Sequence, residues 1–391
     1  MELRRISQLP PYVFAATDAL KLELRRAGED VIDLGFGNPD VPSPEVAVEK
    51  LCEAAQNPRN HRYSASRGIP NLRRAICDLY SRRFGVELDP ETQALTTIGA
   101  KEGLAHVLWV LVEPGDAALV PSPSYPIHIF APVFAGAVVE QVPMGAGEDL
   151  FGNVVEAYER SRPKPRVLIL SFPHNPTGAV VDLALMQRIV DFSRERELVV
   201  VHDFAYAEIA FDGHEPPSIL QADGAAEVSV ELYSLTKGFS MAGWRVGFVV
   251  GNPEVIAALA RLKSYLDYGT FQPIQIASIV AMNEAQEYPR EVCEIYRARR
   301  DTLCDGLSRA GWDVPKPKGT MFVWAEIPDS YRELGSVEFA LKLTREAKVA
   351  VSPGAGFGPG GEGHVRFALV ENEQRIRQAV RGIRTALKEG A

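Results

Sequence analysis

Ser234-Leu-Thr-Lys-Gly-Phe-Ser-Met-Ala-Gly-Trp-Arg245 is the stretch that decides the fold of this chain. It lies between two apolar runs, 228–235 and 244–251, which are typical of buried strands bounded by glycine. A lysine at the edge of a sheet can be partly desolvated, which lowers its pKa and makes Lys237 a candidate amine nucleophile. The hydroxyl of Ser234 and the guanidinium of Arg245 could clamp a phosphate beside it. The alternative is an exposed lysine in a glycine-rich loop.

Other apolar runs also end in polar or aromatic residues. The runs are 92–98, 116–121, 166–172 and 197–202, and the residues that follow them include Gly99, Ala100, Lys101, Tyr125, Asn175, Asp203 and Tyr206. In open α/β sheets, ligands bind at the carboxyl edge of the strands. Each residue has a plain structural alternative: a turn, a helix cap or a core aromatic ring. Their order along the chain beside Lys237 nevertheless predicts one common site.

Together these motifs resemble class I aminotransferases of the pyridoxal phosphate fold-type I superfamily. The resemblance covers nearly the whole chain, from Leu9 to the final helix. It implies that Lys237 holds pyridoxal 5'-phosphate covalently, and that Asp203 pairs with the pyridine nitrogen and keeps it protonated. Asn175 and Tyr206 match the donors to the phenolic oxygen of the ring. Lys237, Asp203 and Tyr206 are therefore the expected catalytic residues.

The same resemblance assigns the remaining cofactor and substrate contacts. Tyr125 matches the ring that stacks on the pyridine, and the phosphate falls to a helix N-terminus, where unpaired amides attract anions. The expected phosphate contacts are Gly99, Ala100, Lys101, Ser234, Arg245 and, from the neighbouring subunit, Tyr63. Arg366 matches the arginine that grips the substrate α-carboxylate with its planar fork. The expected substrate contacts are Gly37, Asn175, Arg366, Lys101 and Tyr12.

The fold expected from the pattern is α/β and doubly wound. Strand and helix patterns alternate from about 48 to 285, which indicates a large domain with a mostly parallel sheet. The resemblance implies seven strands in that sheet. Residues 15–47 and 286–391 form a smaller α+β domain, residues 1–14 form an N-terminal arm, and the long helix expected at 288–307 marks the change of domain. Ser122–Pro123 and Asn175–Pro176 are expected to be cis by resemblance.

The substrate is less sharply indicated than the cofactor. The closest resemblance is to bacterial glutamate–pyruvate (alanine) aminotransferases, which implies L-alanine and 2-oxoglutarate as substrates and pyruvate and L-glutamate as products. Lys101 either binds the side-chain carboxylate of an acidic substrate or only neutralises phosphate. Aspartate and LL-diaminopimelate aminotransferases remain alternatives, and a pyridoxal phosphate-dependent C–S lyase is a more distant one. A regulator on the same fold would need a DNA-binding segment for which no pattern is seen.

Composition narrows the partners and the compartment. The chain has 391 residues with 42 Lys and Arg against 51 Asp and Glu, and the resulting net charge of −9 argues against nucleic acid or an anionic membrane as a partner. The four cysteines have no paired spacing and no histidine pair has ligand spacing, so no metal site is expected and a reducing cytoplasm fits. The N-terminus has no apolar signal region. Sharing of Tyr63 implies a homodimer.

Overall fold

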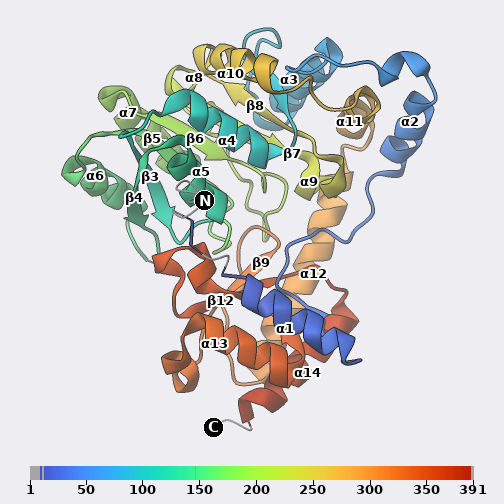
Figure 1. Ribbon diagram of the computed structural model, residues 1–391, viewed down its shortest axis with the longest axis vertical. Coiled ribbons are helices and arrows are strands. Elements are labelled where there is room, and N and C mark those ends of the chain that lie inside the picture. Colours follow the sequence, from blue (N-terminus) through green and yellow to red (C-terminus); the bar gives the residue numbers. More distant parts are fainter. Residues whose placement is uncertain (1–8, 11–12, 146, 389–391) are drawn as a thin grey trace, which may run out of the picture.

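A computed structural model of the chain describes residues 9–10, 13–145 and 147–388. Figure 1 shows a large upper body built around one sheet and a smaller lower body, with the long helix α12 (Tyr288–Arg309) running between them. The expected doubly wound α/β class is confirmed, and so is the long helix.

The central sheet has seven strands in the order β2-β8-β7-β6-β5-β3-β4. Its strands are β2 (Ala94–Thr97), β3 (Ala117–Ser122), β4 (Val138–Pro143), β5 (Pro165–Leu170), β6 (Val199–Asp203), β7 (Ser229–Ser234) and β8 (Gly247–Gly251). All neighbours are parallel except β8, which is antiparallel to both β2 and β7. The carboxyl ends of all strands but β8 therefore meet at one edge.

Helices cover both faces of this sheet because its strands alternate two sets of apolar side chains. Val201 and Leu232 face one way and pack with helices α4, α5 and α10. Leu168 and Val200 face the other way, towards α6 and α7. The helices of this body are α2 (Glu45–Ala55), α3 (Pro70–Phe84), α4 (Ala100–Leu111), α5 (Pro126–Ala135), α6 (Leu150–Arg160), α7 (Leu183–Arg196), α8 (Ala225–Val228), α9 (Leu235–Gly238), α10 (Pro253–Leu266) and α11 (Gln272–Glu284).

Local sequence explains where several of these helices begin and end. Helices α3, α5 and α12 carry proline in the first turn, where the missing amide costs nothing. Helices α3 and α5 are followed by Gly85 and Gly136 in the left-handed conformation. These glycines end α3 and α5 before the chain turns towards β2 and β4, respectively.

The smaller body packs short strands and helices on its own apolar core. Its elements are α1 (Ala15–Arg26), β1 (Ile32–Asp33), β9 (Phe322–Glu326), α13 (Gly335–Lys342), β10 (Val349–Ala350), β11 (Ser352–Pro353), β12 (His364–Ala368) and α14 (Glu373–Lys388). Strand β12 lies between β11 and β9, antiparallel to both, while β1 pairs with β10 in parallel. Segments from both ends of the chain therefore share this core.

The division of the domains at 47/48 and 285/286 stays a prediction, and most of the expected arm, 1–14, lies outside the described residues. Within the described ranges, no helix is long and apolar enough to cross a membrane.

Candidate active site

A cavity of about 450 Å³ lies where the carboxyl edge of the large sheet faces the smaller body. Its volume is in the range of small-molecule sites. Eleven of the residues singled out in the sequence line it: Gly37, Ala100, Lys101, Tyr125, Asn175, Asp203, Tyr206, Ser234, Lys237, Arg245 and Arg366. Segments more than 300 residues apart in the chain are thus brought together at one place.

Lys237 reaches into this cavity from the short helix α9, directly after β7. Its Nζ donates to the carbonyl oxygen of Gly37 at 2.8 Å. Burial, followed by the positive charges of Arg366 and Arg245, lowers the pKa of Lys237 to about 7. The amine is therefore substantially neutral, and nucleophilic, near neutral pH. Gly37 has to be glycine, because a Cβ there would lie 2.6 Å from the Phe322 ring.

Arg366 approaches the same cavity from the smaller body, in the middle of β12. Its Nη1 donates to Asn175 Oδ1 at 2.9 Å and its Nη2 to the carbonyl oxygen of Gly35 at 3.0 Å. The guanidinium carbon lies 3.9 Å from the centre of the Phe322 ring and 4.6 Å from that of Phe357. Such stacking holds a guanidinium in one orientation, which suits a planar anion such as a carboxylate.

Asp203 ends β6 and is held by a chain of hydrogen bonds that the sequence did not reveal. Its Oδ2 lies 2.8 Å from His128 Nε2, and His128 Nδ1 lies 2.9 Å from Ser124 Oγ. Because a carboxylate only accepts, we assign the proton to Nε2 and the Ser124 hydroxyl as donor to Nδ1. The backbone amide of Ala205 donates to Oδ1 at 3.1 Å. These contacts leave Asp203 fixed in orientation at the base of the cavity.

An anion-binding cradle lies at the N-terminus of α4. The first amides of a helix have no acceptor within the helix, so Ala100 and Lys101 present theirs to the cavity. Gly99, the residue before the helix, has φ of 80°, and a Cβ on it would strike the guanidinium of Arg245. A Cβ on Gly247 would lie 2.5 Å from the Ala100 nitrogen. Both glycines therefore keep this space open for backbone amides and Arg245 to face one ligand.

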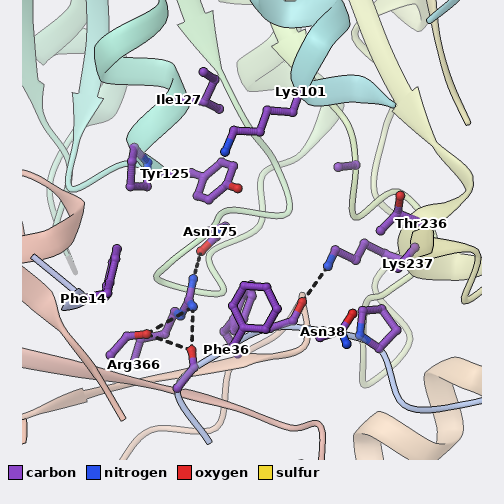
Figure 2. Close-up of a pocket in the computed structure, with 18 of the residues that line it drawn as sticks. Phe14, Phe36, Asn38, Lys101, Tyr125, Ile127, Asn175, Thr236, Lys237 and Arg366 are labelled. Atoms are coloured by element: carbon purple, nitrogen blue, oxygen red, sulfur yellow. Dashed lines mark hydrogen bonds between the residues drawn. The ribbon is translucent and has the colours of Figure 1, made fainter. Parts of the chain in front are cut away.

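Two tyrosines and a lysine line the remaining wall. Burial raises the pKa of Tyr206 well above its ordinary value and also raises that of Tyr125, so both hydroxyls stay protonated and can donate. Lys101 Nζ lies 5.8 Å from the centre of the Tyr125 ring. Figure 2 shows Lys101 and Arg366 reaching in from opposite sides.

Three of the expected site residues are not among those that line the cavity. Tyr63 is 86% exposed and its ring lies 4.5 Å, centre to centre, from that of Tyr268. Gly99 is the residue that precedes α4, and Tyr12 falls outside the described residues. The expected cis bonds, Ser122–Pro123 and Asn175–Pro176, are both present.

The structure also adds residues that the sequence did not suggest. Lys21, from α1, donates to Asp18 and Asp33 at 2.7 Å each, at the rim of the cavity. Burial opposes its charge, but the two hydrogen bonds outweigh burial and raise the pKa of Lys21. Asp33 Oδ1 accepts from the backbone amide of Gly35, so this ion cluster braces the loop that leads to Gly37. Phe36, on the same loop, is 67% exposed.

Comparison with known proteins agrees with this geometry. Residues 29–383 match the family model for aminotransferase class I and II. The chain is 53% identical to the glutamate-pyruvate aminotransferase AlaC of Escherichia coli strain K12, over 98% of this chain and 93% of that protein. It is 42% identical to an LL-diaminopimelate aminotransferase of Dehalococcoides mccartyi, over 96% of each chain. The substrate-bound structure of BacF from Bacillus subtilis superposes with a TM-score of 0.92 at 35% identity, covering 98% of this chain and 97% of that one.

Matches of this extent and identity, on a chain that gathers a lysine, an aspartate and an anion cradle in one cavity, show the family. The chain belongs to the class I and II aminotransferases, which depend on pyridoxal phosphate.

Proposed function

We propose that this enzyme transfers the amino group of L-alanine to 2-oxoglutarate, giving pyruvate and L-glutamate. The observation that carries the chemistry is the placement of Lys237, with its lowered pKa, across one cavity from the Arg366–Asn175 pair. The substrate assignment is supported by the greater identity to the E. coli glutamate-pyruvate enzyme than to the LL-diaminopimelate enzyme, 53% against 42%.

The residues of the cavity fit pyridoxal phosphate. The cradle of Ala100, Lys101, Ser234 and Arg245, kept open by Gly99 and Gly247, suits a phosphate dianion. Asp203 is assigned to the pyridine nitrogen, and Tyr125 to the face of the ring. The phenolic oxygen is assigned to Asn175 and Tyr206. Pyridoxal phosphate, when bound, supplies an electron-withdrawing ring that makes the Cα–H bond of an attached amino acid acidic.

Lys237 is the proposed general base and acid. Its Nζ, with a pKa of about 7, is suited to accept the Cα proton of the substrate near neutral pH and would pass it to the carbonyl carbon of the cofactor; in the second half of the reaction it would carry a proton in the opposite direction. Asp203, oriented by His128, balances a positive charge at the base of the cavity. Tyr206 stays protonated and so acts as a hydrogen-bond donor.

Arg366 is the proposed anchor for the α-carboxylate shared by all four reactants. Its guanidinium is stacked between Phe322 and Phe357, so little side-chain freedom is lost when a carboxylate binds. Asn175 and the backbone of Gly37 are the proposed secondary contacts, because both lie beside Arg366 or Lys237. Tyr12 keeps its assignment as a proposed substrate contact, on resemblance alone.

The second carboxylate of glutamate and 2-oxoglutarate needs its own cation. Lys101 enters from the side opposite Arg366, which supports it as that group. Its place in the first turn of α4 equally allows it to neutralise the phosphate. The two roles predict different responses to Lys101→Met, given in the Discussion.

The enzyme is proposed to act as a homodimer in the cytoplasm. Tyr63 and Tyr268 form an exposed aromatic pair away from the cavity of their own chain, which supports a role for Tyr63 in the phosphate site of a neighbouring subunit. All four cysteines are free, as expected in a reducing compartment. Mixing Tyr63→Phe with Lys237→Ala protein should restore one intact site per hybrid dimer, and no recovery would contradict sharing.

The direct test is the visible spectrum of the purified holoenzyme, titrated separately with four amino acids. Loss of the band of the bound aldehyde cofactor with both L-alanine and L-glutamate, at low concentration, is the expected result. Loss with glutamate and aspartate but not alanine would move the enzyme to aspartate, and a response to LL-diaminopimelate alone would favour that substrate. In a separate assay with a cysteine thioether as substrate, pyruvate, ammonia and a thiol formed without any keto acid would indicate a C–S lyase.

A further inference from the structure

Glu231 is a fully buried carboxylate that the proposed chemistry does not use. It lies in the middle of β7, with a side chain that is 0% exposed. Four groups donate to it: Tyr80 Oη and Ser218 Oγ to Oε1, both at 2.7 Å, the backbone amide of Ile219 to Oε2 at 2.9 Å, and His202 Nδ1 to Oε2 at 2.7 Å. Among the residues that the structure describes, no lysine or arginine forms an ion pair with it.

His202 also contacts the segment that follows β5. The backbone amide of Phe172 donates to His202 Nε2 at 3.2 Å. Nε2 must therefore be unprotonated, which leaves the single proton of a neutral ring on Nδ1, where it is donated to Glu231. The geometry fixes both the tautomer and the ring orientation of His202.

The Glu231–His202–Phe172 chain runs across three adjacent strands behind the active site. His202 is paired with Glu231 in the parallel β6–β7 register and immediately precedes Asp203. Successive side chains of a strand point to opposite faces, so Asp203 lines the cavity while His202 and Glu231 lie on the other side of the sheet. Phe172 follows β5, three residues before Asn175. Glu231 itself lies six residues before Lys237.

Stability alone does not account for this arrangement. A carboxylate taken out of water without a cation is costly, and its hydrogen bonds only offset that cost. A well-packed apolar cluster in place of Glu231 and its side-chain donors would avoid that cost. What the carboxylate adds is direction: strong, charge-assisted hydrogen bonds that fix where each partner lies.

We propose that Glu231 is a positioning residue, which through His202 sets the carboxyl ends of β5, β6 and β7 and so the mutual placement of Asn175, Asp203 and Lys237. The inference rests on the proposed function of those three residues. It concerns a group that touches neither cofactor nor substrate.

Three variants separate this role from ordinary stabilisation. Glu231→Gln removes the charge while keeping the shape, so the hydrogen bond from His202 becomes a weaker neutral one. His202→Asn can still place an amide nitrogen at the Nδ1 position but has no atom where Nε2 accepts from Phe172. Tyr80→Phe is the matched control, because it removes a hydrogen bond of equal length to the same carboxylate, on the oxygen that does not contact His202.

Each variant is measured for kcat, for substrate KM, for pyridoxal phosphate affinity of the apoprotein and for thermal unfolding of the apoprotein. We expect Glu231→Gln and His202→Asn to lower kcat about tenfold and to weaken cofactor binding about fivefold, with KM changed less than twofold. The double variant should lose little more than either single one, because both break the same chain. Tyr80→Phe should change kcat and cofactor affinity less than twofold, even if its melting temperature falls as much as those of Glu231→Gln and His202→Asn.

Two results would overturn the proposal. One is a Glu231→Gln and a His202→Asn enzyme that both keep kcat and cofactor affinity within twofold of wild type. The other is a Tyr80→Phe enzyme that loses as much kcat and cofactor affinity as Glu231→Gln and His202→Asn do. If Glu231→Gln does not fold, the comparison of His202→Asn with Tyr80→Phe decides. A wild-type protein without transaminase activity would refute the proposed function instead, while the cofactor affinities would still test the positioning role.

Discussion

The two walls of the active-site cavity are built in different ways. The sheet wall consists of strand ends: Asp203 ends β6, and Lys237 follows within a few residues of β7. The opposite wall is assembled from the loop that leads to Gly37, from Phe357 and from Arg366 in the middle of β12. One wall is rigid because it continues a buried sheet, whereas the other depends on contacts between distant segments. Chemistry is therefore expected to fail when the first wall changes, and binding when the second does.

The largest effect should come from removing the amine of the first wall. Lys237→Ala takes away both the group that holds the cofactor and the proposed general base, so turnover should fall by at least about 10⁴-fold. The cradle of Arg245 and the α4 N-terminus is untouched, so added pyridoxal phosphate should still bind, as absorbance after gel filtration would show. Turnover above about one hundredth of the wild-type rate would exclude the proposed role of Lys237.

The same contrast explains what the sequence could predict. Lys237, Asp203 and Asn175 each follow a largely apolar run, so the strand pattern predicts that they meet at one sheet edge. Arg366 lies inside a strand of alternating pattern, and only its resemblance to a known motif singled it out. His128 was missed although it lies three residues after Tyr125, because its partner Asp203 is 75 residues away in the chain.

Two other features of the structure have no pattern in the sequence that predicts them. The Lys21–Asp33 contact joins a helix to a two-residue strand, and charged residues in such segments usually read as solvated surface. Glu231 lies within the apolar run 228–235, and nothing in that run indicates its buried partners Tyr80, His202 and Ser218. The roles of Lys21 and Glu231 depend on contacts with residues far away in the chain, and a single sequence does not reveal such contacts.

The second prediction concerns the pH dependence of the apoprotein. The pKa of Lys237 is about 7 in the folded chain and 10.5 for an ordinary lysine, so between these values the unfolded chain binds more protons. Wild-type stability should therefore rise with pH from about 7 to 10.5. Lys237→Met removes this slope, and should exceed the wild-type apoprotein in unfolding free energy by a few kcal/mol below pH 7 and by much less near pH 10.5.

Urea unfolding of both apoproteins at several pH values measures that difference. The matched control is Lys348→Met, a lysine of the smaller body that lies outside the cavity and pairs with Glu29 at 3.2 Å. A wild-type curve parallel to that of Lys237→Met across the whole range would show that the amine is not desolvated.

The third prediction tests the second wall. Arg366→Lys keeps the positive charge but loses the fork that binds two oxygens and the stacking between Phe322 and Phe357. We expect KM for L-alanine and L-glutamate to rise together by about 30-fold, or about 2 kcal/mol, with a smaller change in kcat. Arg300→Lys is the control, because this buried arginine pairs with Asp212 outside the cavity. A loss confined to kcat would place Arg366 with the chemical wall.

The smallest effect is expected at Lys101, which tests whether the two walls divide binding and chemistry as cleanly as proposed. If Nζ binds the second carboxylate, Lys101→Met should raise KM for L-glutamate and 2-oxoglutarate about tenfold and leave L-alanine and pyruvate unchanged, because only the dicarboxylates lose an ion pair. If Nζ neutralises the phosphate, cofactor affinity should fall and all four substrates should change alike. The first outcome would make the sheet wall a specificity surface as well as a chemical one, and the second would leave substrate recognition to the α-carboxylate contacts around Arg366.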